Sequence, residues 1–258
     1  MNEIIKQESP SQKMARYLGS ESVKKQFESV LKESAGSFMA SIIESYNDKA
    51  IAGCEPSAVI IEAMKAASLK LPLNKSLGYA YLVSFKNVPT FIIGYKGLTQ
   101  LALRTGYYRN INTGAIYEGQ IKSQNFITGE FELCQPDLSK PVIGYFAYLE
   151  LVNGFRKFIY MNKTDIEAHA KKYSKSYASE KSAWTTDFES MAKKTVLRNL
   201  LSHWGYMSVE MAQSVANEED APNYGTEILP NSQPLPEAKK ELPELPEPPL
   251  AKEESPGF

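Results

Sequence analysis

Cationic and aromatic side chains are the groups in this sequence that are best suited to binding a ligand, and they are interspersed through its centre. Between Glu62 and Glu118, 55 positions contain no acidic residue. The same positions contain seven cations: Lys65, Lys70, Lys75, Lys86, Lys96, Arg104 and Arg109. They also contain eight rings: Tyr79, Tyr81, Phe85, Phe91, Tyr95, Tyr107, Tyr108 and Tyr117. Positive charge without local carboxylates is typical of a surface that binds a polyanion. The alternative is that these lysines pair with distant acids and most of the rings pack in the core.

A second group of cations follows later in the chain. Lys194 and Arg198 are four residues apart on a helix expected over 183–204, so both can point toward one groove. The alternative is an ordinary solvated helix face. Lys175 and Lys181 lie in a polar stretch, Tyr173 to Ser182, that is a candidate mobile loop. The tyrosines and Trp184 are candidates for stacking on unpaired bases.

Other kinds of chemistry find little support. No G-x-x-x-x-G-K-[ST] or G-x-G-x-x-G motif is present, so ATP-driven action is disfavoured. Cys54 and Cys134 are expected to be small buried residues, and two histidines in no metal-ligand spacing disfavour a metal site. Glu130 and Glu132 are expected on the surface of a hairpin. Asp165 and Glu167 are expected in a helix cap, so neither pair suggests catalysis. We therefore expect a binding protein rather than an enzyme, with no cofactor.

The charge of the chain divides into two parts. The total is −1, but residues 217–258 hold ten acids, three lysines and nine of the fifteen prolines, a net of −7. Residues 1–216 consequently carry +6. The composition predicts a flexible arm over 1–19, one binding domain over 20–216 and a disordered, extended acidic tail over 217–258. With no long apolar run and no apolar leader, we expect a cytoplasmic protein without a membrane partner.

The periodicity predicts an α+β fold in which helices flank a central antiparallel β-sheet or hairpin. Helices are expected over about 20–33, 36–46, from Pro56 to about 70, 97–105, from Thr164, over 183–204 and over 208–217. Strands are expected over 78–86, 90–95, 107–117, 126–133 and 142–160. The last of these folds back at Asn153-Gly154, and the first two are joined through Asn87-Val88-Pro89. Thr164 to Glu167 is a capping-box pattern.

Three segments together resemble the RecT family of phage and prophage single-strand annealing proteins. They are Ser76 to Phe85, Phe91 to Gly106, which includes Gly94-Tyr95-Lys96-Gly97, and Trp184 to Arg198. They come in the family's order, and the resemblance extends over about residues 55 to 215. Neither the arm nor the tail carries a motif of the family.

The resemblance implies a protein that binds single-stranded DNA and anneals it to a complementary strand without ATP, passing through an annealed duplex intermediate. It also implies homo-oligomers, either rings or helical filaments, and as partners a phage exonuclease and the host single-strand binding protein. Seven residues become the expected DNA contacts: Tyr95, Lys96, Gln100, Arg104, Lys193, Lys194 and Arg198. Arg109, Lys175 and Lys181 are added from their charge alone. Two alternatives remain open: a passive coating protein of single-stranded DNA or RNA, and a nuclease.

Overall fold

The chain divides into two units, Met1–Tyr224 and Gly225–Phe258. The computed structural model describes residues 8–125, 127–174, 176–180 and 182–216, all of which belong to the first unit. The acidic tail over 217–258 and the first seven residues of the expected arm lie outside the described residues.

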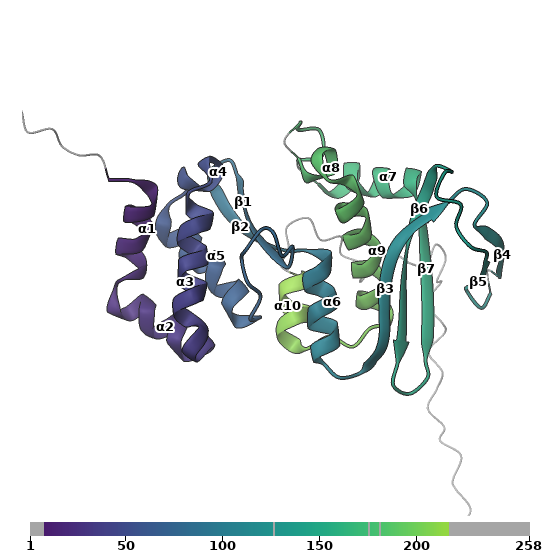
Figure 1. Cartoon of the computed structure of the whole chain (residues 1–258), viewed down its shortest axis with the longest axis horizontal. Coiled ribbons are helices and arrows are strands. Elements are labelled where there is room, and N and C mark those ends of the chain that lie inside the picture. The colour runs from purple at the N-terminus through teal and green to yellow at the C-terminus, as the bar shows by residue number, and fades with distance from the viewer. Residues whose placement is uncertain (1–7, 126, 175, 181, 217–258) are drawn as a thin grey trace, which may run out of the picture. The chain divides into compact units, whose positions relative to one another are not determined.

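Five helices and one short 3-10 turn open the described chain (Figure 1). They are α1 (Pro10–Leu18), α2 (Glu21–Leu31), the turn η1 (Lys32–Ser34), α3 (Ala35–Tyr46), α4 (Lys49–Ala52) and α5 (Pro56–Ser68). Helices α1, α2 and α3 contact one another and each also packs on α5. The predicted helices over 20–33, over 36–46 and from Pro56 are confirmed to within a few residues, and Pro56 takes the first helical position, where its missing N–H costs nothing.

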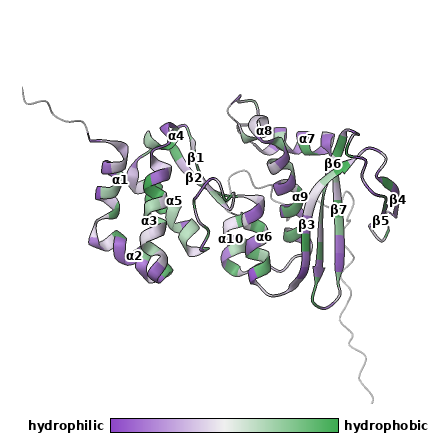
Figure 2. Cartoon of the chain, viewed as in Figure 1, coloured by the Kyte–Doolittle hydropathy of each residue, from purple (hydrophilic) through white to green (hydrophobic). Residues whose placement is uncertain are grey.

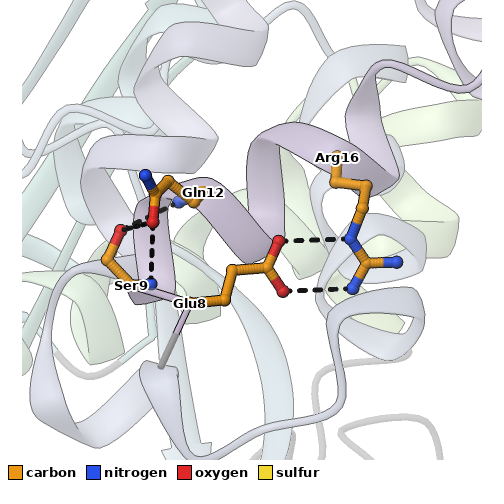
Figure 3. A network of polar contacts seen from close by, with 4 residues as sticks. All are labelled: Glu8, Ser9, Gln12 and Arg16. Atoms are coloured by element: carbon orange, nitrogen blue, oxygen red, sulfur yellow. Dashed lines mark hydrogen bonds and ion pairs between the residues drawn. The ribbon is translucent and has the colours of Figure 1, made fainter. Parts of the chain in front are cut away.

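The expectation of a loose arm is wrong for residues 10–18, which form α1. Ser9 caps this helix: its hydroxyl accepts from the Gln12 backbone N–H at 3.3 Å, and the Gln12 amide oxygen accepts from the Ser9 N–H at 3.0 Å (Figure 3). The Arg16 guanidinium pairs with Glu8 through two contacts of 3.2 Å. Met14 and Leu18 are buried in the core. This capping box and the pair of buried residues stabilise a helix that the charged, polar composition concealed.

Strands β1 (Ala80–Phe85) and β2 (Val88–Ile93) form an antiparallel hairpin that packs on α4 and α5. Its turn is Lys86-Asn87, one residue earlier than predicted, because Phe85 pairs with Val88. Both turn residues have positive φ, 52° and 64°, as a two-residue type I′ turn requires. The hairpin ends directly at α6 (Tyr95–Arg104).

A three-stranded antiparallel sheet in the order β3-β6-β7 forms the larger part of the β structure. Its strands are β3 (Tyr108–Tyr117), β6 (Val142–Leu151) and β7 (Arg156–Asn162). The predicted reversal at Asn153-Gly154 is confirmed, with Gly154 at φ 87°. Along β6 the residues Tyr145, Ala147, Leu149 and Leu151 alternate with less buried ones. These four face the helix α9 (Phe188–Trp204), which covers one side of the sheet (Figure 1).

A second hairpin, β4 (Ile121–Asn125) and β5 (Glu130–Leu133), replaces the single strand predicted over 126–133. Its surface is largely polar (Figure 2). Phe131 attaches it to the main sheet, with ring centroids 4.8 Å from Phe158 and 6.2 Å from Tyr160.

The remaining helices are α7 (Lys163–Tyr173), α8 (Ala183–Thr186) and α10 (Val209–Ala216). The long helix predicted over 183–204 is interrupted at Asp187, whose backbone leaves the helical region and whose carboxylate caps α9 by accepting from the Ser190 N–H. The cap of α7 is Asn162 rather than Thr164, with its side-chain oxygen 2.7 Å from the Asp165 nitrogen. The α+β prediction is confirmed. Within the described ranges, no helix has the length and apolar character of a membrane span.

Candidate nucleic-acid interface

The segment Gly94-Tyr95-Lys96-Gly97 forms the predicted strand-to-helix junction, at the start of α6. Both glycines are needed for close backbone contact. A Cβ at Gly94 would lie 2.3 Å from the Gly78 carbonyl oxygen, and a Cβ at Gly97 would lie 2.1 Å from that of Tyr79. The Gly94 N–H donates to Tyr79 at 2.9 Å. The glycines therefore fix the first turn of α6 against the loop that precedes β1, and this contact sets the position of Tyr95 and Lys96.

Tyr95 and Lys193 are brought together across α6 and α9. The Lys193 ammonium lies 5.7 Å from the centre of the Tyr95 ring and also pairs with Glu189. Tyr95 is half-buried, Lys96 is exposed and Gln100 is half-buried on the same helix. Tyr81 lies nearby, and its pKa is raised by burial and by the neighbouring Asp187 and Tyr95. An ammonium over a tyrosine ring is a cation–π contact, and it holds the Lys193 charge beside the start of α6.

Three further lysines of α7 lie over aromatic rings. Lys163 is 5.7 Å from the Phe188 ring centre, Lys171 is 5.9 Å from that of Tyr177, and Lys172 is 4.9 Å from that of Tyr173. Trp184 connects these pairs, with ring centroids 6.2 Å from Tyr177 and 5.8 Å from Phe188. We call the set formed by Tyr95, Lys96, Lys163, Lys171, Lys172, Tyr173, Tyr177, Phe188 and Lys193 the lysine–aromatic surface.

Trp184 is buried inside this arrangement rather than presented for stacking, with 7% of its surface exposed. The stretch Tyr173 to Ser182, expected to be a candidate mobile loop, is held by the Tyr177 contact and by hydroxyl pairs that join Ser174 to Ser176 and Ser176 to Ser182 at 3.2 and 3.3 Å. Lys175 and Lys181 lie outside the described residues.

Arg104 and Arg109 contact groups that do not belong to the lysine–aromatic surface. The Arg104 guanidinium donates to the carbonyls of Leu69 and Lys70 at 2.7 and 3.2 Å, where it caps the end of α5. Arg109 pairs with Glu150 at 3.3 Å, and Arg156 pairs with the same carboxylate at 3.2 Å. Both predicted contacts therefore already have partners within the chain. In the acid-free stretch, Lys65 and Lys75 likewise pair with Glu62 and Asp48.

Lys194 and Arg198 are buried, with 9% and 6% of their surfaces exposed. They do not form a solvated helix face, which was one of the two alternatives. Arg198 donates to the carbonyl of Val215 in α10. Burial, followed by the charges of Arg198 and Lys172, lowers the pKa of His169 on α7 to about 4. Arg198 therefore joins α9 to α10, and little of either cation is open to a ligand.

Lys163, Lys171 and Lys172 belong to the lysine–aromatic surface but were not among the DNA contacts predicted from the sequence. A signal for two of them was present, since Lys171-Lys172 directly precedes Tyr173 at the end of an expected helix. Basic residues there also suit the negative end of a helix dipole, so the pattern by itself was ambiguous. Lys163 gave no comparable signal, because its ring partner Phe188 is far away in sequence.

The acidic side chains of the described residues do not converge. In the described ranges, no three His, Cys, Asp or Glu side chains gather where they could hold a metal ion. Glu132 pairs with Lys122 at 3.3 Å, and the Asp165 carboxylate accepts from the Asn162 side chain at 2.8 Å.

Comparison with known proteins shows which family this sequence is similar to. The sequence model of the RecT family matches residues 36–231. The chain is 46% identical over 209 residues to the uncharacterized protein YqaK of Bacillus subtilis strain 168, covering 80% of this chain and 72% of YqaK. It is 30% identical over 184 residues to protein RecT of Escherichia coli K12, covering 67% of this chain and 66% of that protein. The chain thus spans slightly less than two thirds of the length of the latter relative. The whole lysine–aromatic surface lies inside the matched region.

Proposed function

The chain belongs to the RecT family, and from this membership we propose that it is an ATP-independent annealing protein that binds single-stranded DNA and pairs it with a complementary strand. The family supports a role in DNA recombination. The observation that carries the finer proposal is the lysine–aromatic surface, since it combines the two kinds of group that bind a single strand without reading its sequence.

Each lysine of this surface has a defined task in the proposal. Lys96, Lys163, Lys171, Lys172 and Lys193 contact phosphates and release the counterions condensed on the strand. Rings that already carry an ammonium, such as Tyr95 and Tyr173, hold that charge in place and offer a face or an edge to a base. Because the contacts are to phosphates and ring faces, binding does not depend on sequence.

Annealing follows if the bound strand keeps its base edges accessible. Pairing then supplies the driving force, about 1.4 kcal/mol for each base-pair step of duplex DNA. The protein lowers the repulsion between two phosphate backbones and aligns the bases, so no nucleotide hydrolysis is required. We further propose that the protein works as a homo-oligomer, a ring or a helical filament, beside a phage exonuclease that produces the strands and a host single-strand binding protein.

One fluorescence assay with complementary oligonucleotides tests this function against its two rivals. The full chain is mixed with donor- and acceptor-labelled strands, with and without magnesium and with and without ATP. Accelerated pairing of intact strands without nucleotide is the expected result. Binding without acceleration would identify a passive coating protein, and magnesium-dependent shortening of the strands would identify a nuclease. Either outcome would overturn the annealing proposal.

A further inference from the structure

A patch of exposed apolar side chains lies where β3 begins, β6 turns into β7 and α9 ends. Tyr107 and Tyr206 stack there with ring centroids 4.5 Å apart and remain 50% and 48% exposed. The Val152 N–H donates to Tyr107 at 2.9 Å, which places Val152, 54% exposed, beside them. Phe155 and Trp204 are exposed on the same turn and the same helix end. We call this set the tyrosine patch. Aromatic side chains gathered on a surface in this way are typical of a protein contact.

A second apolar surface is concave and lies between α1, α2 and α5. Two adjoining pockets of about 400 and 340 Å³ share Gln26, Ile60 and Ile61. The apolar lining is Tyr17, Val23, Ile60, Ile61 and Met64. Ile61 is 63% exposed although it is apolar. We call this the α5 groove.

Cations stand at the rim of the α5 groove. Arg16 and Lys65 line the pockets and pair with Glu8 and Glu62. Glu8 engages Nε and Nη2 of the Arg16 guanidinium along one edge (Figure 3). One face of the guanidinium lies over the Tyr17 ring, 5.1 Å from its centre. Since a guanidinium is planar, its second face can stack on a further ring. An apolar floor with a cationic rim suits a partner that presents tyrosines.

We propose that the tyrosine patch of one copy of this chain occupies the α5 groove of a second copy. The exposure of Tyr107, Tyr206 and Ile61 means that the two surfaces do not cover each other within one chain. One charged pair is also possible: Glu210, whose pKa is lowered by hydrogen bonds from its own backbone and from Ser208, follows the patch as an exposed carboxylate. It can face Arg16 or Lys65, whose side chains remain 63% and 51% exposed beside their own glutamate partners.

Such a contact is heterologous, since it joins different surfaces of two identical chains. Each added copy leaves one free patch and one free groove, so the assembly closes into a ring or extends as a helix. The inference rests on the proposed homo-oligomer and specifies which surfaces build it. It does not depend on DNA.

Sedimentation velocity of the full chain without DNA tests the contact. The groove variant is Ile61→Asp and the patch variant is Val152→Asp, each at a position more than half exposed. Val88→Asp is the matched control, because Val88 is 60% exposed and also lies next to a hairpin turn. We expect the wild-type chain and the control to assemble, and the two variants to associate at least tenfold more weakly. Unchanged circular dichroism and thermal unfolding verify that the variants are folded.

Mixing the two variants gives the sharper result. The intact patch of the Ile61→Asp copy can enter the intact groove of the Val152→Asp copy, but the remaining surfaces are blocked. An equimolar mixture is therefore expected to form dimers and nothing larger, while each variant alone stays monomeric. Tyr206→Asp in place of Val152→Asp must give the same pattern.

The outcomes separate this contact from the proposed function. If the wild-type chain assembles and Ile61→Asp assembles equally well, or if the mixture gives no dimer, the contact is wrong and the homo-oligomer stands. If residues 1–7 of the same chain fill the groove instead, Ile61→Asp should assemble as well as the wild-type chain. If the wild-type chain is monomeric throughout, both the homo-oligomer and the contact are wrong, while annealing is judged by the separate strand-pairing assay.

Discussion

Lys193 makes both a cation–π contact and an ion pair, because its ammonium lies over the Tyr95 ring and also pairs with Glu189. Replacing it with alanine should remove one of the proposed phosphate contacts. The slope of the logarithm of the binding constant against the logarithm of salt concentration should fall in magnitude by about 0.7, and affinity at 0.15 M salt by about fourfold. Fluorescence anisotropy with a labelled oligonucleotide measures both. Lys140→Ala, an exposed lysine between β5 and β6, is the control and should change neither. Equal slopes in all three proteins would remove Lys193 from the interface.

Arg198 carries a different expectation because its guanidinium is buried and donates to Val215. Arg198→Ala leaves that carbonyl without its partner and removes packing from beneath α10. We expect the free energy of unfolding to fall by about 1–3 kcal/mol, with any loss of DNA affinity following from the weaker fold. Urea denaturation measures the change. An Arg198→Ala protein of wild-type stability that nevertheless binds DNA more weakly would instead make Arg198 a direct contact.

His169 couples stability to pH, because burial and the charges of Arg198 and Lys172 lower its pKa to about 4 from an ordinary 6.5. The folded chain favours the neutral ring. Its contribution to stability is therefore complete above pH 6.5 and is lost as the pH falls from 6.5 to about 4. Since the ring is only partly buried, we expect a loss of about 1–2 kcal/mol over this range. His169→Phe keeps a ring beside Tyr173 and should show a smaller loss on acidification, measured by thermal unfolding. An identical acid loss in both proteins would contradict this assignment.

At the scale of the elements, the glycines of the β2-to-α6 junction determine where α6 can begin. Gly97→Ala places a Cβ 2.1 Å from the Tyr79 carbonyl oxygen, which the backbone must move to avoid. We expect a loss of about 2 kcal/mol or more, with Tyr95 displaced. Gly36→Ala is the control, since it lies within α3 and its Cβ meets nothing within 4 Å. That change should raise stability by up to about 1 kcal/mol. Chemical denaturation of both variants provides the test, and a Gly97→Ala protein as stable as wild type would contradict it.

Much of the element order could be predicted because local signals and tertiary packing agree. The hairpin at Asn153-Gly154 and the helix start at Pro56 follow from backbone preferences that hold in any context. α1 was missed because its stability depends on burying Met14 and Leu18 against helices that no local pattern indicates. The interruption at Asp187 was missed for a related reason, since the apolar spacing continues through it.

The candidate site was less predictable than the fold, because charge in a sequence does not state exposure. Lys194 and Arg198 look like an accessible helical pair, yet both are buried. Arg104 has the expected charge but is engaged by carbonyls some 35 residues earlier in the chain. The pairs that join Lys163 to Phe188 and Lys193 to Tyr95 depend on contacts between separate elements, which spacing along the chain cannot reveal.

At the scale of the whole molecule, a near-neutral total conceals two opposed charges. Residues 1–216 carry +6 and residues 217–258 carry −7. We predict that the acidic segment competes with DNA for the lysines of residues 1–216, and that this competition is strongest where the DNA contacts are nonspecific. On this prediction, the segment would favour release of DNA that is held by charge alone.

Deleting residues 217–258 tests this role of the acidic segment. We expect annealing of complementary strands to continue and affinity for nonspecific duplex DNA to rise severalfold at 50 mM salt, because an internal competitor is lost. Screening should reduce this gain at 0.3 M salt, where the Debye length is only about 6 Å. A full-length variant with its ten acids changed to Asn and Gln separates charge from chain length and should behave like the deletion. Filter binding measures the duplex affinity. If the deletion abolishes annealing or lowers thermal stability, the segment belongs to the folded domain; if the amide variant behaves as wild type, its charge is not the cause.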